Sequence, residues 1–111
     1  MADNNLAQMK CGPCHSDTPP LKGEELQQYA DNLPEGWDVV EEHHLVKKFK
    51  FRDFKAALAF TNTIGAIAED EGHHPDILLG YGAVEVQILT HFINGLSEND
   101  FILAAKIDEA A

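Results

Sequence analysis

Residues 53–92 change from a helical to a strand-like spacing of apolar side chains. In the first half, apolar residues recur every three or four positions, Asp53 can cap a helix, and Gly72 can take the left-handed conformation that ends one. In the second half, apolar and polar residues alternate around a Gly-Ala pair that suits a tight turn. This change predicts a helix followed by a β-hairpin whose second strand ends at His91. The residues expected to face the core from the helix are Phe54, Ala57, Leu58, Thr61, Ile64, Gly65 and Ala68.

The rest of the chain repeats this alternation of elements. Residues 23–33 have a helical spacing, whereas residues 39–41 and 45–51 carry the branched and aromatic side chains of a hairpin. Near the end of the chain, Ser97 and Asp100 have the spacing of a capping box at the start of a last helix. The order α-β-β-α-β-β-α predicts an α+β fold, a two-layer sandwich in which a four-stranded antiparallel sheet carries its helices on one face.

Length and charge narrow the possible functions. The 111 residues suffice for one domain with a single core. A formal net charge of -11 opposes binding to phosphate backbones, so nucleic acid is not an expected partner. The sequence has no run close to the roughly 18 apolar residues of a membrane span, and its opening stretch MADNNLAQMK lacks the basic and apolar regions of a leader peptide. We therefore expect a cytoplasmic protein with no membrane partner.

The segment CGPCH, residues 11–15, spaces its cysteines like a redox pair or half of a zinc site, and its histidine completes the spacing for covalent haem attachment. The segment lies between polar and Pro-rich stretches, whereas a thioredoxin-like motif follows a strand and opens a helix. Three interpretations stay open: an idle or locally structural pair, a zinc half-site or redox sensor, and haem binding or catalysis. We favour the first, and expect residues 1–19 to form a flexible arm and residues 20–111 the folded domain.

Three histidines are expected to meet at one place in this fold. His73 and His74 follow the predicted end of the long helix, and Pro75 biases His74 toward extended backbone, so the two rings should point in different directions. The second hairpin returns His91 to their neighbourhood. Such a cluster suits a catalytic zinc site, a structural role or cofactor-free acid–base catalysis; because the helical His spacing of many zinc enzymes is absent, we favour acid–base catalysis and expect no metal. The other adjacent pair, at residues 43–44, falls in a predicted turn and is expected to be exposed.

Several short motifs occur at fixed spacings around these histidines. The motif EDEGHHP is followed by Tyr81, then by the pair Thr90-His91, and then by GLSENDF, which contains Asp100. In residue types and spacing these motifs resemble the pterin-4a-carbinolamine dehydratase family. The resemblance runs from about Pro20 to the end of the chain, and the KCxxC stretch before PPL is similar to the N-terminus of one bacterial and plant subgroup.

This resemblance implies a hydro-lyase, a 4a-hydroxytetrahydrobiopterin dehydratase. The reaction converts 4a-hydroxytetrahydropterin to quinonoid dihydropterin and water, supports tetrahydropterin recycling, and uses no metal and no cofactor. The resemblance implies that His73 and His91 act as acid and base and that His74 binds and helps to position the pterin. The substrate-binding residues that it implies are Glu69, Pro75, Thr90, Phe92, Ile93 and Asp100.

Other interpretations of the carboxylates and of the family remain. Helix capping alone can explain Asp100, and Glu69 can be a solvated helix residue. The resemblance also implies a second class of function, because some family members act as protein-binding, assembly or dimerisation factors. It further implies a homodimer or homotetramer and a functional link to an aromatic amino acid hydroxylase.

Overall fold

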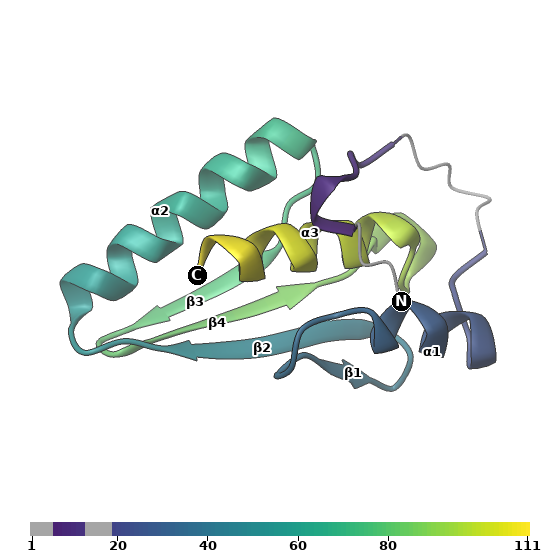
Figure 1. Cartoon of the computed structure of the whole chain (residues 1–111), viewed down its shortest axis with the longest axis horizontal. Helices are drawn as coiled ribbons and strands as arrows, with labels where there is room; N and C mark the ends of the chain where they lie inside the picture. The colour runs from purple at the N-terminus through teal and green to yellow at the C-terminus, as the bar shows by residue number, and fades with distance from the viewer. Residues whose placement is uncertain (1–5, 13–18) are drawn as a thin grey trace.

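The computed structural model describes residues 6–12 and 19–111, and its elements follow the order expected from the sequence (Figure 1). The helices are α1 (Gly23–Asp31), α2 (Phe54–Glu71) and α3 (Glu98–Ala110). The strands are β1 (Asp38–Val40), β2 (His44–Lys50), β3 (Asp76–Gly80) and β4 (Ala83–Ile88), and the short 3-10 helices are η1 (Leu6–Gln8) and η2 (His91–Ile93). The predicted α+β class is therefore confirmed.

The four strands form one antiparallel sheet in the order β1-β2-β4-β3. The two predicted hairpins supply the outer pairs, and β2 and β4 join them at the centre, where Leu45 lies opposite Ile88 and Phe49 lies opposite Val84. Because side chains alternate along a strand, these residues share the face that the helices cover, and all of them are buried. Figure 1 shows α2 and α3 over this face of the sheet.

Helix α3 is buried on almost all sides, not only along the short apolar face expected from its sequence. Phe101, Leu103 and Ile107 are each 0% exposed. The sheet covers one side of α3, whereas Tyr29 of α1 stacks on Phe101 with ring centroids 5.3 Å apart, and η1 packs against α3 elsewhere. The additional cover comes from elements that are distant in sequence, so the periodicity of α3 could not reveal it.

The N-terminal segment takes part in this core. Residues 6–12 were expected to belong to a flexible arm, but in the structure they pack along α3, and Leu6 is only 6% exposed. A single leucine with few apolar neighbours in sequence gives no periodic signal, which explains why the packing was not predicted.

The buried stripe of α2 is rotated relative to the prediction. The residues that face the core are Ala57, Phe60, Ile64 and Ala68, whereas Phe54 and Leu58 are 43% and 41% exposed. Phe60 sets this rotation by packing on two aromatic rings. Its ring centroid lies 4.9 Å from that of Phe49 in β2 and 5.3 Å from that of Phe51, the residue directly after β2.

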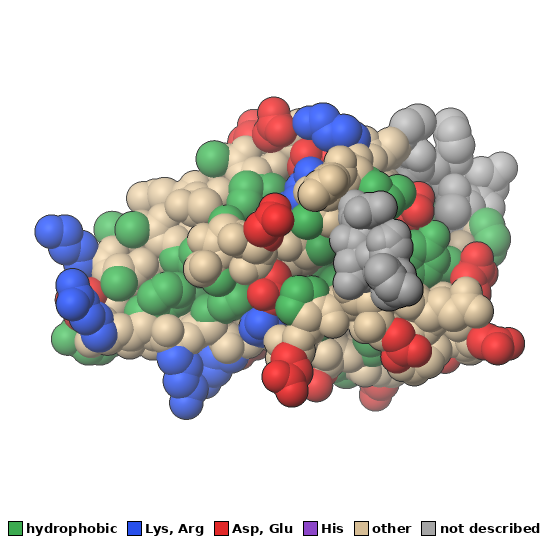
Figure 2. All heavy atoms as spheres, in the orientation of Figure 1, with side chains coloured by type: hydrophobic (Ala, Val, Ile, Leu, Met, Phe, Trp, Pro, Cys, Tyr) green, Lys and Arg blue, Asp and Glu red, His purple; other side chains and the backbone are tan. Residues whose placement is uncertain are grey.

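Charge is distributed unevenly over the surface. Figure 2 shows Lys and Arg side chains gathered at the end of the molecule where β2 leads into α2, with Asp and Glu side chains spread over much of the rest of this face. Five of the eight basic residues fall within residues 47–55. In the described part of the chain, no helix is long and apolar enough to cross a membrane.

Candidate active site

The predicted histidine pair lies directly after the C-terminus of α2. Asp53 caps the start of this helix by accepting a hydrogen bond from the backbone N–H of Ala56, and Gly72 ends it in the left-handed conformation with φ 67°. Positive φ is where glycine has its advantage over other residues, so Gly72 turns the chain sharply toward β3. The two imidazoles then point in different directions, as the sequence predicted: the side chain of His73 is 14% exposed and that of His74 is 59% exposed.

His91 reaches the same region from a turn and not from a strand. The sequence predicted that β4 ends at His91, but β4 ends at Ile88. Thr90 pairs with Gly95 across an isolated bridge, with the N–H of Thr90 donating to the carbonyl of Gly95 over 2.9 Å, and η2 lies between them. Pairing Thr90 with Gly95 reverses the chain, and this reversal ends the strand early.

Asp100 connects the last helix to His73. Its side chain is 0% exposed, and its Oδ1 lies 2.6 Å from Nε2 of His73. Its Oδ2 accepts hydrogen bonds from the backbone N–H of Ser97 and from the hydroxyl of Thr90, each over 2.8 Å. One carboxylate therefore does two things: one oxygen caps α3, as the sequence predicted, and the other contacts His73.

Glu69 pairs with the second histidine of the pair. Its Oε2 lies 2.5 Å from Nε2 of His74, and both side chains are largely exposed, at 79% and 59%. An ion pair at such a solvent-exposed position contributes little to stability, roughly 0–1 kcal/mol. The contact therefore matters for the orientation of the ring more than for the fold.

These elements surround a cavity of about 310 Å³. Its lining consists of Gly72, His73, His74, Leu89, Thr90, His91 and Phe92. All three predicted histidines, Thr90 and Phe92 are thus brought together, and Asp100 and Glu69 hold two of the rings. Pro75 and Ile93 do not line the cavity; Ile93 is 8% exposed because successive side chains of a 3-10 helix point in different directions.

Sequence reasoning missed Leu89 and Ser97 at this site. Leu89 is 7% exposed and forms part of the cavity wall, and the hydroxyl of Ser97 lies 2.9 Å from that of Thr90 behind it. The alternating pattern of β4 predicted that Leu89 faces away from the core. In the structure the chain turns after Ile88, and this turn places Leu89 at the cavity. The capping-box spacing marked Ser97, but as a helix signal alone.

No metal-binding cluster is present in the described residues. Within residues 6–12 and 19–111, no three side chains of His, Cys, Asp or Glu are grouped so as to hold a metal ion. The three cavity histidines therefore do not form such a group.

The histidines at residues 43–44 are not simply exposed, as had been expected. Both are half-buried, their rings are perpendicular with Nδ1 atoms 3.0 Å apart, and Nε2 of His43 lies 2.9 Å from Oδ1 of Asn94. Asn94 ends η2, so this pair supports the turn that carries His91. The partner is distant in sequence, and spacing could not identify it.

Cys11 has the surroundings of a structural thiol. Its Sγ donates a hydrogen bond to the carbonyl of Asn99 over 3.6 Å, and burial and the negative charge of Glu71 raise its pKa to about 12. A thiol that stays protonated is a poor nucleophile and a poor metal ligand. The CGPCH motif contains two further candidate ligands or redox groups, Cys14 and His15. Both lie outside the described residues.

Comparison with known proteins identifies the family. Residues 19–110 match the family model described as pterin 4 alpha carbinolamine dehydratase. The chain belongs to the pterin 4 alpha carbinolamine dehydratase family. Two relatives that carry pterin-4-alpha-carbinolamine dehydratase as a provisional name come from Alkaliphilus metalliredigens, with 54% identity over 96% of each chain, and from Rubrobacter xylanophilus, with 52% identity over 95% of this chain and 97% of the relative. The family predicted from the motifs is therefore confirmed.

Solved structures of dehydratase-like proteins share the fold. A transcriptional coactivator/pterin dehydratase from Brucella melitensis superposes with a TM-score of 0.76 at 33% identity, over 82% of this chain and 97% of that one. A pterin dehydratase-like protein described as a RuBisCO assembly factor in the alpha-carboxysome superposes with a TM-score of 0.58 at 25% identity, over 68% and 88%. Proteins of this dehydratase fold therefore carry names from more than one class of function.

Proposed function

We propose that this member of the pterin 4 alpha carbinolamine dehydratase family catalyses the dehydration of 4a-hydroxytetrahydropterin to quinonoid dihydropterin and water. The observation that carries the proposal is the cavity whose lining includes His73, His74 and His91. Its volume of about 310 Å³ is at the lower end of the range for small-molecule sites, roughly 300–1,000 Å³.

The reaction requires proton transfer and no change in oxidation state overall. The C4a–O bond breaks as the hydroxyl group takes up one proton and leaves as water, and the ring system gives up one proton as the new double bond forms. One acid and one base are therefore sufficient, and each returns to its starting state when the protons are exchanged with water. Imidazole is the side chain whose ordinary pKa, about 6.5, suits both roles near neutral pH.

The contacts around the rings support a division of roles. Nε2 of His73 faces Oδ1 of Asp100, and a carboxylate accepts hydrogen bonds, so Nε2 carries the proton and Nδ1 is left to exchange protons with a substrate. We propose His73 and His91 as the acid and base. His74, whose Nε2 faces Glu69, would bind the pterin at the open side of the cavity. Phe92, 50% exposed at the rim, offers an apolar face to the flat bicyclic ring.

Measurement of dehydration rates with purified protein tests this proposal. Metal-stripped wild-type protein should accelerate dehydration of the carbinolamine, and His91→Ala or a combined His73→Ala and His74→Ala change should remove most of the acceleration. Asn62→Ala is the control, because this exposed residue of α2 lies outside the cavity lining. Wild-type protein that does not accelerate the reaction refutes the proposal, and activity that is lost with a chelator and restored by zinc refutes the cofactor-free mechanism.

Protein binding is a second candidate function, supported by exposed apolar side chains. Phe54 and Leu58 lie one turn apart on α2 and are 43% and 41% exposed, and Leu78 and Tyr81 at the β3 edge of the sheet are 67% and 72% exposed. Such positions suit contacts between copies of the chain or with another protein, so we propose a homo-oligomer. Light scattering at several concentrations tests this, and a monomer throughout would contradict it.

A further inference from the structure

The stretch Leu6–Gly12, called here the N-terminal segment, lies next to both helix ends that form the candidate site. Figure 1 shows it beside the end of α2 and over α3. Helix α2 ends at Glu71, two residues before His73, and Asn99 in the first turn of α3 directly precedes Asp100. A segment bound to both ends can influence the distance between them.

Glu71 is the attachment point on α2. Its side chain is 3% exposed, its Oε1 accepts a hydrogen bond from the backbone N–H of Cys11 over 2.8 Å, and Nζ of Lys10 lies 3.5 Å from its Oε2. Burial raises the pKa of the Glu71 carboxyl, but the N–H of Cys11 and the ammonium groups of Lys106 and Lys10 outweigh burial and hold the pKa below its usual value. The N-terminal segment is therefore attached to α2 through a buried, negatively charged carboxylate.

Asn99 is the attachment point on α3. Its Oδ1 accepts a hydrogen bond from the N–H of Gly12 over 3.0 Å, and its Nδ2 donates to the carbonyl of Gly12 over 2.8 Å. Its own carbonyl accepts the hydrogen bond from the Cys11 thiol. The side chain thus pairs with both backbone groups of one residue, as a neighbouring strand would.

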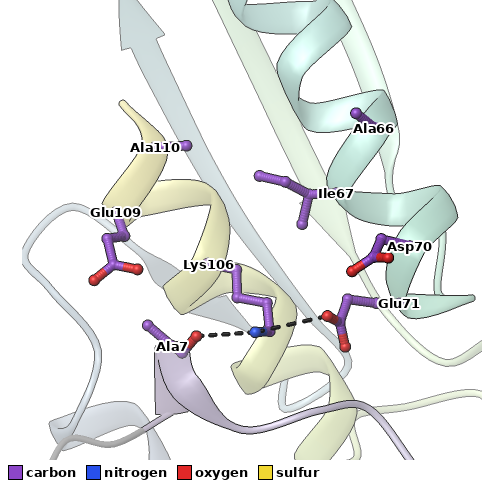
Figure 3. A pocket seen from close by; sticks show the side chains of 8 residues that line it. All are labelled: Ala7, Ala66, Ile67, Asp70, Glu71, Lys106, Glu109 and Ala110. Atoms are coloured by element: carbon purple, nitrogen blue, oxygen red, sulfur yellow. Dashed lines mark hydrogen bonds and ion pairs between the residues drawn. The ribbon is translucent and has the colours of Figure 1, made fainter.

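Lys106 ties the other end of the segment to the same two helices. Figure 3 shows it reaching from α3 across a hollow of about 430 Å³ between the carbonyl of Ala7 and the carboxylate of Glu71. The distances are 2.9 Å to the carbonyl and 3.6 Å to the carboxylate. With this lysine included, the segment, α2 and α3 are joined in one network.

We propose that the N-terminal segment is a positioning element of the candidate active site. By joining Glu71 to Asn99 it sets the separation of the α2 and α3 ends, and hence the contact between His73 and Asp100 that selects the proton-carrying nitrogen. The segment does not reach the cavity lining, so it acts through these two residues. This inference rests on the function proposed above.

Two substitutions weaken the attachment, and each has a matched control. Asn99→Ala removes both side-chain hydrogen bonds to Gly12, whereas Gly12→Ala keeps the backbone groups and adds a Cβ that meets nothing within 4 Å. Glu71→Gln removes the charge that Lys106 contacts. Its control is Asp108→Asn, which changes a lysine-paired carboxylate on α3 that is 16% exposed and outside the cavity lining.

Two measurements decide the proposal. Because small displacements of catalytic groups cost up to about a hundredfold in rate, we expect Asn99→Ala and Glu71→Gln to lower kcat on the order of tenfold with little change in KM. The ¹H–¹⁵N correlation spectrum of the His73 ring should show a single Nε2-protonated tautomer in wild-type protein and a mixture of tautomers in these two variants. Gly12→Ala and Asp108→Asn should retain both properties.

The outcomes separate this inference from the proposed function. If Asn99→Ala and Glu71→Gln lower only the melting temperature, with kcat and the His73 spectrum as in wild type, the segment is purely structural and the proposal fails. If wild-type protein has no dehydratase activity, the function fails, and the His73 spectrum alone then decides whether the segment sets the contact between His73 and Asp100.

Discussion

Replacing Asp100 with asparagine separates the capping role of this residue from its contact with His73. The amide is almost isosteric with the carboxylate, but it has one accepting atom instead of two. The N–H of Ser97 and the hydroxyl of Thr90 both need an acceptor at the position of Oδ2, so the amide oxygen should occupy it. The amide NH₂ then faces Nε2 of His73, and Nε2 must accept a hydrogen bond instead of donating one.

The expected loss can be worked from these contacts. A hydrogen bond to a charged group contributes about 1.5–3 kcal/mol, and about 1.4 kcal/mol corresponds to tenfold in rate, so kcat should fall by roughly 10- to 150-fold. The cap survives, so the free energy of unfolding should fall by only about 1 kcal/mol. Asp100→Ala is a poorer test, because it leaves three donors without an acceptor around a side chain that is 0% exposed, and so threatens the fold.

Ser97→Ala is the matched control for this change. It removes the hydroxyl group that contacts Thr90 and should cost about 1 kcal/mol of stability, while the Ser97 backbone N–H and the contact between Asp100 and His73 remain. Steady-state dehydration kinetics and urea unfolding measure both quantities. If Asp100→Asn and Ser97→Ala have the same kcat within about twofold, Asp100 acts only as a helix cap and the reasoning is refuted.

The remaining predictions concern residues outside the cavity lining. Gly95→Ala should destabilise the protein by about 1–3 kcal/mol in urea unfolding, because its Cβ would lie 2.7 Å from Cβ of Pro20; an unchanged midpoint would contradict this. Iodoacetamide should alkylate Cys11 in the folded protein at pH 8 at least roughly tenfold more slowly than in urea, as followed by peptide mass spectrometry, since its pKa is raised to about 12. The same shift has a definite sign for stability: above about pH 8.5 the unfolded chain loses this proton while the folded one keeps it, so the free energy of unfolding should decline as pH rises. Glu41→Asn should raise stability by about 0.5 kcal/mol, because Glu41 has φ 53°, a conformation that asparagine adopts more readily; a lower unfolding midpoint would argue against this account.

The elements of the fold were predictable because their signals are local. Capping by Asp53, termination at Gly72 and the alternation along β4 each depend on residues within a few positions of one another. The same local logic set the divergence of His73 and His74, since the end of a helix and a following proline decide the backbone of the residues between them. Motif spacing then identified the family, because spacing is itself a property of the sequence.

The site depended on contacts that no local signal encodes. Asp100 and His73 are 27 positions apart. The capping spacing alone could explain Asp100 and the resemblance implied a place for it in the site, but only the packing of α3 against α2 shows its Oδ1 2.6 Å from the ring of His73. The rotation of α2 followed from one aromatic residue, Phe60, packing on the sheet.

The sequence by itself therefore determined which elements form, where they begin and end to within a few residues, and which residues can carry proton chemistry. Only the tertiary structure decided which oxygen meets which nitrogen, and that Leu6 and the residues after it belong to the core. The physical reason is the range of the forces involved. Backbone preferences and caps act over a few residues, whereas the position of one element against another depends on how side chains from distant parts of the chain fill a shared interior.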